Sequence, residues 1–111
     1  MSVVKIKPTD KYINNTYIKT SEIVLISEEF YATTGESFLV VRDISHSKVK
    51  LNSINTDHIT IKSLTDVLIL PDIGKIDDEY DELQIGRGAC VEFYHALGTW
   101  YIVSSDGLKG S

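Results

Sequence analysis

The acidic stretch from Asp72 to Glu82 is the first candidate for a chemical site, because carboxylate oxygens are the ligands that calcium prefers. An EF-hand loop needs oxygen ligands at positions 1, 3, 5 and 12 and a glycine at position 6. Counted from Asp72, the third position is Gly74 and the fifth is Ile76; counted from Asp77, the sixth is Glu82. The spacing fails both ways, so we expect a solvated surface loop, no metal ligands and no cofactor.

The histidines and the single cysteine form no catalytic pattern. His46, His58 and His95 are far apart, and none has a partner at metal-ligand spacing. Cys90 is expected to be a small core residue, since nothing beside it marks it as a nucleophile. The sequence also has no Gly-x-Ser-x-Gly motif and no phosphate-binding loop. We therefore predict a protein that is not an enzyme, with no catalytic residues.

Aromatic side chains are the remaining candidates for a binding site. Rigid amphipathic rings suit contact surfaces for proteins or sugars. Tyr94, Trp100 and Tyr101 lie together in the last quarter of the chain, and we take them as the candidate binding residues. About half of the tyrosines are expected to form edges of a β core instead.

Those residues belong to the clearest structural element, a hairpin predicted over residues 89–104. Val91 and Phe93 alternate with polar residues, which sends alternate side chains to opposite faces of a strand. Gly98 stands where a short hairpin loop needs a positive φ. Burying Trp100 would remove roughly 200 Å² from water, worth about 5 kcal/mol. We therefore expect this hairpin at the centre of the core.

Short strands are predicted along the whole chain. Apolar or alternating segments separated by turn residues occupy residues 4–6, 23–26, 38–41, 48–51, 59–62, 67–70 and 83–85. Residues 27–36 are expected to form a loop with one helical turn. Strands that recur about every 8–12 residues are typical of an antiparallel β-sandwich or barrel. The chain is therefore predicted to be all-β, with residues 1–20 as an N-terminal strand and arm and residues 21–111 as the β domain.

Ile23–Ile26, Phe38–Val41 and Val67–Leu70 are apolar at every position, so both faces of these strands should be covered. One explanation is that they are central core strands with a neighbour folded over them. The other is that sister subunits bury their outer faces. The pattern fits both.

Composition excludes several classes of function. With 11 basic and 16 acidic residues the net charge is -5, which argues against nucleic-acid binding. No apolar run reaches the roughly 18 residues that a membrane span needs, and the N-terminus lacks the apolar core of a signal peptide.

Residues 82–108 resemble the C-terminal ending of structural proteins from tailed bacteriophages. The similar features are the glycine-rich turn Gly86-Arg87-Gly88, an alternating strand, a Gly-Thr segment with a following Trp, and a last strand ending in Asp106-Gly107. Residues 23–71, with their short strands and the Leu70-Pro71 turn, resemble the body of such proteins. Fibres, spikes, baseplate parts and head decorations use these modules, commonly as homotrimers.

The resemblance implies a virion structural protein that self-associates, as a homotrimer, and attaches to other virion proteins, with residues 1–20 as the attachment segment. The alternative is a receptor- or carbohydrate-binding tip domain that contacts a host surface glycan through Trp100, Tyr94 and Tyr101. A metal-dependent hydrolase is a third, weaker alternative. A buried Trp100 would favour the structural role, and an exposed one the sugar-binding role.

Overall fold

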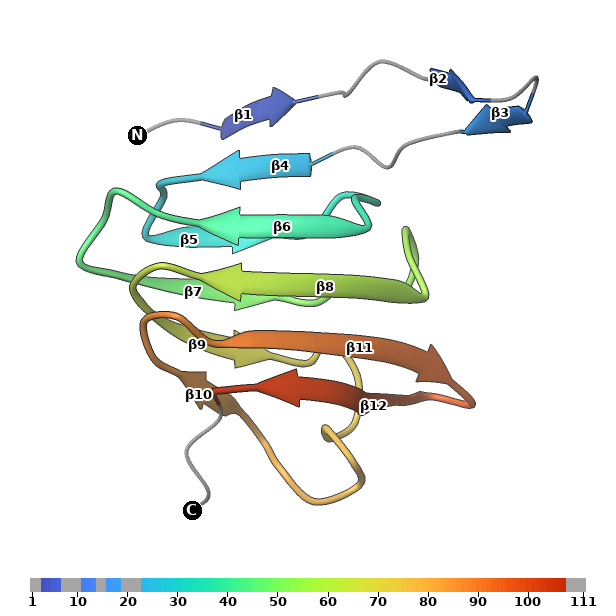
Figure 1. Ribbon diagram of the computed structural model, residues 1–111. Coiled ribbons are helices and arrows are strands. Elements are labelled where there is room, and N and C mark those ends of the chain that lie inside the picture. The colour runs from blue at the N-terminus through green and yellow to red at the C-terminus, as the bar shows by residue number, and fades with distance from the viewer. Residues whose placement is uncertain (1–2, 7–10, 14–15, 19–22, 108–111) are drawn as a thin grey trace.

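The computed structural model describes residues 3–6, 11–13, 16–18 and 23–107, in which the chain forms two facing sheets and a small separate hairpin (Figure 1). The six-stranded sheet contains, in spatial order, β1 (Val3–Ile6), β4 (Ile23–Ile26), β6 (Phe38–Val41), β8 (His58–Ser63), β11 (Cys90–Ala96) and β12 (Thr99–Asp106). The four-stranded sheet contains β10 (Leu83–Ile85), β9 (Asp66–Leu70), β7 (His46–Lys50) and β5 (Phe30–Ala32). The hairpin pairs β2 (Lys11–Ile13) with β3 (Thr16–Ile18). The all-β prediction is confirmed, since the described residues contain no helix.

From β4 to β9 the chain crosses to the opposite sheet after every strand. Strands β4, β6 and β8 are therefore neighbours in one sheet and run parallel, as β5, β7 and β9 do in the other. The chain winds as a flattened coil, in which each turn adds one strand to each sheet (Figure 1). The predicted antiparallel arrangement is wrong for these strands, and neither sheet of the described residues closes into a barrel. Between two neighbouring strands of one sheet the chain crosses over, runs back along the opposite sheet and crosses again, so the next strand has the direction of the first (Figure 1). A hairpin would reverse the direction instead.

Antiparallel strands cover both ends of the coil. At one end β1 pairs with β4, and at the other β10 pairs with β9 while β11 pairs with β8. Of the arm expected over residues 1–20, only these strand segments β1, β2 and β3 are described; residues 1–2, 7–10, 14–15 and 19–20 lie outside the described residues.

Strand β5 corrects the prediction of a helical turn in residues 27–36. Tyr31 at its centre is buried and pairs in register with Val49. The loop that follows folds around the buried carboxylate of Glu36, which accepts hydrogen bonds from the Tyr31 hydroxyl at 3.3 Å and from the Thr34 backbone N–H at 3.0 Å. Burial of Tyr31, together with the negative charge of Glu36, raises the pKa of this tyrosine.

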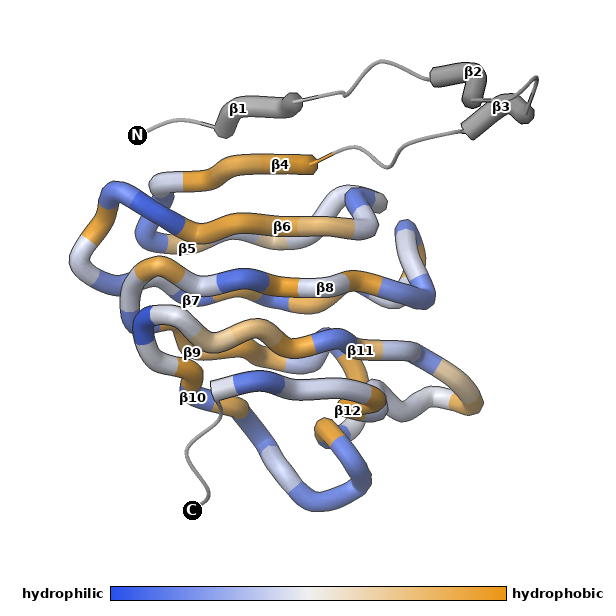
Figure 2. Tube along the Cα trace, viewed as in Figure 1, coloured by the Kyte–Doolittle hydropathy of each residue, from blue (hydrophilic) through white to orange (hydrophobic). Residues whose placement is uncertain are grey.

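The core lies between the two sheets and takes alternate residues from each strand. In all three continuous apolar runs only one face is buried, and the side chains on the other face are partly exposed. Figure 2 shows the apolar character of β4 and β6 continuing along the whole of each strand. The inward residues of the runs are Val24, Ile26, Leu39, Val41, Val67 and Ile69.

The predicted C-terminal hairpin is confirmed. Its two-residue loop consists of Leu97 and Gly98, both at positive φ (52° and 80°), which is the geometry that matches the twist of two antiparallel strands. Trp100 follows the loop and is fully buried, as is Phe93 on the partner strand. The hairpin therefore contributes the two largest fully buried side chains of the described residues.

We expect Trp100→Ala to lower the free energy of unfolding by about 3–5 kcal/mol, because the substitution leaves a large cavity in a packed core. Equilibrium denaturation in urea measures this loss. Tyr101→Ala, on the exposed face of the same strand, is the matched control and should cost far less. A loss below about 1 kcal/mol for Trp100→Ala would contradict a core role for the indole.

Candidate functional site

The outer face of the six-stranded sheet brings together side chains that are far apart in the sequence. His58 on β8 lies opposite Tyr94 on β11, and Tyr94 lies opposite Tyr101 on β12. The rings of His58 and Tyr94 stack with their centres 4.3 Å apart. Tyr94 and Tyr101 are 45% and 36% exposed, so this row of three rings presents aromatic surface to solvent.

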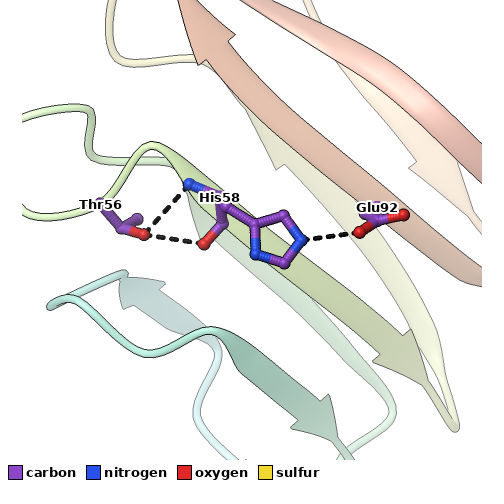
Figure 3. Close-up of polar contacts among 3 residues, drawn as sticks. All are labelled: Thr56, His58 and Glu92. Carbon is purple, nitrogen blue, oxygen red and sulfur yellow. Dashed lines mark hydrogen bonds and ion pairs between the residues drawn. The ribbon is translucent and has the colours of Figure 1, made fainter. Parts of the chain in front are cut away.

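A histidine–carboxylate pair fixes one end of this ring row. His58 Nε2 lies 2.7 Å from a carboxylate oxygen of Glu92, and both side chains are about one-third exposed (31% each) (Figure 3). Thr56 holds the start of β8, since its hydroxyl donates to the His58 carbonyl oxygen at 2.7 Å and accepts from the His58 backbone N–H at 3.2 Å. These contacts orient His58 against Tyr94.

The other half of the same face is apolar. Ile23 lies beside Phe38, and Leu25 beside Val40, on the parallel strands β4 and β6. All four are only partly buried. We call the four residues the apolar strip. The outer face thus passes from the apolar strip to the polar outer residues of β8, and from there to Tyr94 on β11 and Tyr101 on β12.

The three candidate binding residues do not share one surface. Tyr94 and Tyr101 are on the outer face, but Trp100 points inward and has no exposed area. Its ring therefore offers no face on which a sugar could stack. The expectation that Cys90 is a core residue is wrong. The neighbouring Val91 occupies the inward position, and Cys90 is a free, partly exposed thiol.

The acidic stretch is only partly the solvated loop that its composition predicts. Glu79, Asp81 and Glu82 are exposed, as expected. Asp72 instead accepts hydrogen bonds from the Trp100 indole N–H at 2.9 Å and from Ser53, whose backbone N–H and hydroxyl both donate at 2.8 Å. In the described part of the chain, no group of three or more histidine, cysteine or acidic side chains could hold a metal ion.

Asp77 closes the free edge of β12. Its backbone N–H donates to the Trp100 carbonyl oxygen at 2.8 Å, and its carboxylate accepts from the Ile102 backbone N–H at 3.0 Å. The next residue, Asp78, accepts a hydrogen bond from the Thr99 hydroxyl at 3.0 Å. Both aspartates adopt positive φ (55° and 56°), a conformation that aspartate tolerates better than most residues. The acidic loop therefore satisfies the outward backbone groups at the start of the edge strand.

Burial of Asp72 would raise its pKa, but the hydrogen bonds from Trp100 and Ser53 to the charged form outweigh burial. The net result is a pKa below the ordinary value of an aspartate. Because the folded pKa is depressed, the contribution of Asp72 to stability is present above the unfolded pKa of about 4 and is lost as pH falls through the folded pKa.

Asp72→Asn keeps the shape of the side chain and an oxygen that can accept from Trp100, but removes the charge. We expect it to lower the free energy of unfolding at pH 7 by about 1 kcal/mol, since hydrogen bonds to charged groups are stronger than neutral ones. The difference from the parent protein should shrink as pH falls below about 4, where the parent carboxylate becomes protonated. Denaturation at a series of pH values measures it, with Asp81→Asn as the exposed control. A difference that is independent of pH would contradict this role of the charge.

The histidines form no catalytic arrangement in the described residues. His46 is exposed, and its Nδ1 lies 3.2 Å from the hydroxyl of the adjacent Ser45. His95 packs near Trp100, and its Nε2 is buried without a hydrogen-bond partner. The ring of His58 hydrogen-bonds to Glu92, while the nearby Thr56 hydroxyl is engaged with backbone. None of these contacts aligns a nucleophile, a base and an acid as acyl transfer requires.

The His58–Glu92 pair was missed in the sequence analysis because the two residues are 34 positions apart. Alternation places each of them on the polar side of its own strand. Only the pairing of β8 with β11 makes them neighbours, and no local pattern specifies that pairing.

No known family model matches the chain, and no curated protein matches it either. Among the described residues, no helix has the length and apolar character needed to cross a membrane.

Proposed function

We propose that the protein is a non-enzymatic structural module of a bacteriophage virion, which self-associates through the outer face of the six-stranded sheet. The apolar strip is the observation that carries this proposal. Four large aliphatic or aromatic side chains on two adjacent strands are partly exposed on one face. Exposed apolar patches of a few hundred Å² are near the limit found on monomeric proteins and commonly mark interaction sites.

Sheet edges that are short or partly covered favour association through a face, and β1, the other edge of the six-stranded sheet, has four residues. Strand β12 is the long edge of the six-stranded sheet, and Asp77 occupies backbone groups near its start. Strands β5 and β10, at the edges of the other sheet, have three residues each. Short or covered edges discourage strand addition from another chain. The outer face that carries the apolar strip is then the surface that we expect a second copy to cover.

The phage assignment is supported by the resemblance of residues 82–108 to the endings of tailed-phage structural proteins. The same resemblance supports a homotrimer, a place in the virion and attachment to other virion proteins through residues 1–20. In the rival role, a glycan-binding tip domain, Trp100 would have to be exposed. Its complete burial favours the structural role, although Tyr94 and Tyr101 stay accessible to a partner.

Sedimentation of the whole chain at micromolar concentration should give about three times the chain mass of 12.4 kDa. Val40→Lys should dissociate the assembly to monomers, because it introduces an ammonium group into the apolar strip. Ile54→Lys is the matched control: Ile54 is 89% exposed in a loop away from the strip, so its substitution should leave the mass unchanged.

Circular dichroism and thermal melting establish that both variants are folded before their masses are compared. A monomeric parent chain would contradict self-association. An assembly that Val40→Lys leaves intact would contradict the use of this face.

A further inference from the structure

A second candidate site lies where the chain crosses between the sheets, away from the outer face. An open cleft with a volume of about 600 Å³ is formed by three turns that follow β6, β8 and β10. Pockets of about 300–1,000 Å³ are the size that small ligands occupy. The residues that line it are Arg42, Asp43, Ile44, Ser45, Leu64, Thr65, Asp66 and Arg87.

Both arginines of the chain line this one cleft. Arg42 and Arg87 are the only arginines in a sequence whose other nine basic residues are lysines, and they are 45 positions apart. The guanidinium group is a planar fork of donors whose geometry matches the two oxygens of a carboxylate. The compact ammonium group of lysine lacks this match. Arg42 donates to Asp43 at 2.9 Å, whereas Arg87 makes no hydrogen bond or ion pair with any described residue. Within the described part of the chain, Arg87 is thus an unused donor at the cleft.

The walls of the cleft are held in place by hydrogen bonds between its turns. The Thr65 hydroxyl donates to the Ser45 carbonyl oxygen at 2.8 Å, and the Leu64 backbone N–H donates to the Val41 carbonyl oxygen at 2.8 Å. The Gly88 backbone N–H donates to Ser63 at 2.8 Å, which fixes the turn that carries Arg87. Asp43 adopts a positive φ of 58°. The backbone of these turns is therefore fixed before any ligand arrives, which lowers part of the entropic cost of binding.

The cleft offers acceptors as well as donors. Asp43 and Asp66 add two carboxylates to the two guanidinium groups, and Ile44 and Leu64 add apolar surface. The two carboxylates disfavour a doubly charged phosphate more than a singly charged acid, because repulsion between like charges grows with the charge of the ligand. A ligand that carries one carboxylate and several hydroxyl groups can pair with the donors and with the acceptors of the cleft. Its carboxylate accepts hydrogen bonds from the two arginines, and its hydroxyls donate to Asp43 and Asp66.

We propose that this cleft binds a polyhydroxylated carboxylic acid of monosaccharide size, such as a uronic acid, with its carboxylate held by Arg87 and Arg42. The carbon-bound hydrogens of the ligand then pack on Leu64, which is 41% exposed. This site is independent of self-association through the apolar strip, because the two surfaces share no residue.

Titration of the isotope-labelled whole chain with sodium glucuronate, followed by amide NMR shifts, tests the proposal. We expect saturable shifts confined to residues 42–45, 64–66 and 86–88, and none with glucose, which has the hydroxyls but no carboxylate. Arg87→Gln should weaken binding about tenfold or more, and Arg87→Lys should recover it only in part, because the fork geometry is lost. Lys50→Gln is the control of equal charge change, at an exposed position on β7, and should bind like the parent.

The amide spectrum of each variant reports folding directly, so a loss of binding is separated from a loss of structure. The proposal is overturned if glucuronate produces no saturable shifts in the cleft, or if glucose shifts the same amides equally. Equal binding by Arg87→Gln would remove the assigned role of Arg87. Tighter binding of glutamate than of glucuronate would overturn the polyhydroxylated class and point to an amino acid ligand.

Discussion

The hydrogen bond from the Trp100 indole to Asp72 is the interaction on which the arrangement of the C-terminal half depends. Trp100 belongs to β12, Asp72 follows β9, and Ser53, which also donates to Asp72, follows β7. A fully buried indole N–H needs an acceptor, and a carboxylate taken from water needs several donors. Each group meets the requirement of the other. The hydrogen bonds that Asp72 accepts from Trp100 and Ser53 therefore join the terminal hairpin to two successive turns of the coil.

That junction also determines which surfaces stay open. With Asp72 fixed beneath Trp100, the acidic loop begins next to β12, and Asp77 reaches the outward backbone groups of that strand. The loop that composition marks as an ion-binding candidate therefore serves as a cover for a sheet edge. The outer face of the six-stranded sheet keeps the partly exposed side chains of the apolar strip.

Local features of the fold could be predicted from the sequence, and long-range pairings could not. Strand positions follow from alternation, and the Leu97–Gly98 turn and the burial of Trp100 follow from glycine placement and side-chain size. The parallel coil was missed because hairpins and crossovers produce the same alternation. The continuous apolar runs in β4, β6 and β9 were the one sequence feature that indicated parallel strands, since such runs are typical of them.

Strand β5 was missed because it has three residues among acidic neighbours. The His58–Glu92 pair and the arginine cleft both depend on which turns of the coil are adjacent, so no local pattern could reveal them.

The coil separates the two proposed surfaces by its geometry. Strand residues alternate between core and outer face, so the apolar strip and the ring row lie on the flat side of the six-stranded sheet. The arginine cleft is built from the crossings that follow β6, β8 and β10, which in Figure 1 stack along the left side of the molecule. Each added turn of a coil contributes a strand to the flat side and a crossing to the rim, so residues can change on one surface without altering the other. Contact between copies through the flat side would leave the rim accessible, and a ligand in the cleft would not compete with assembly.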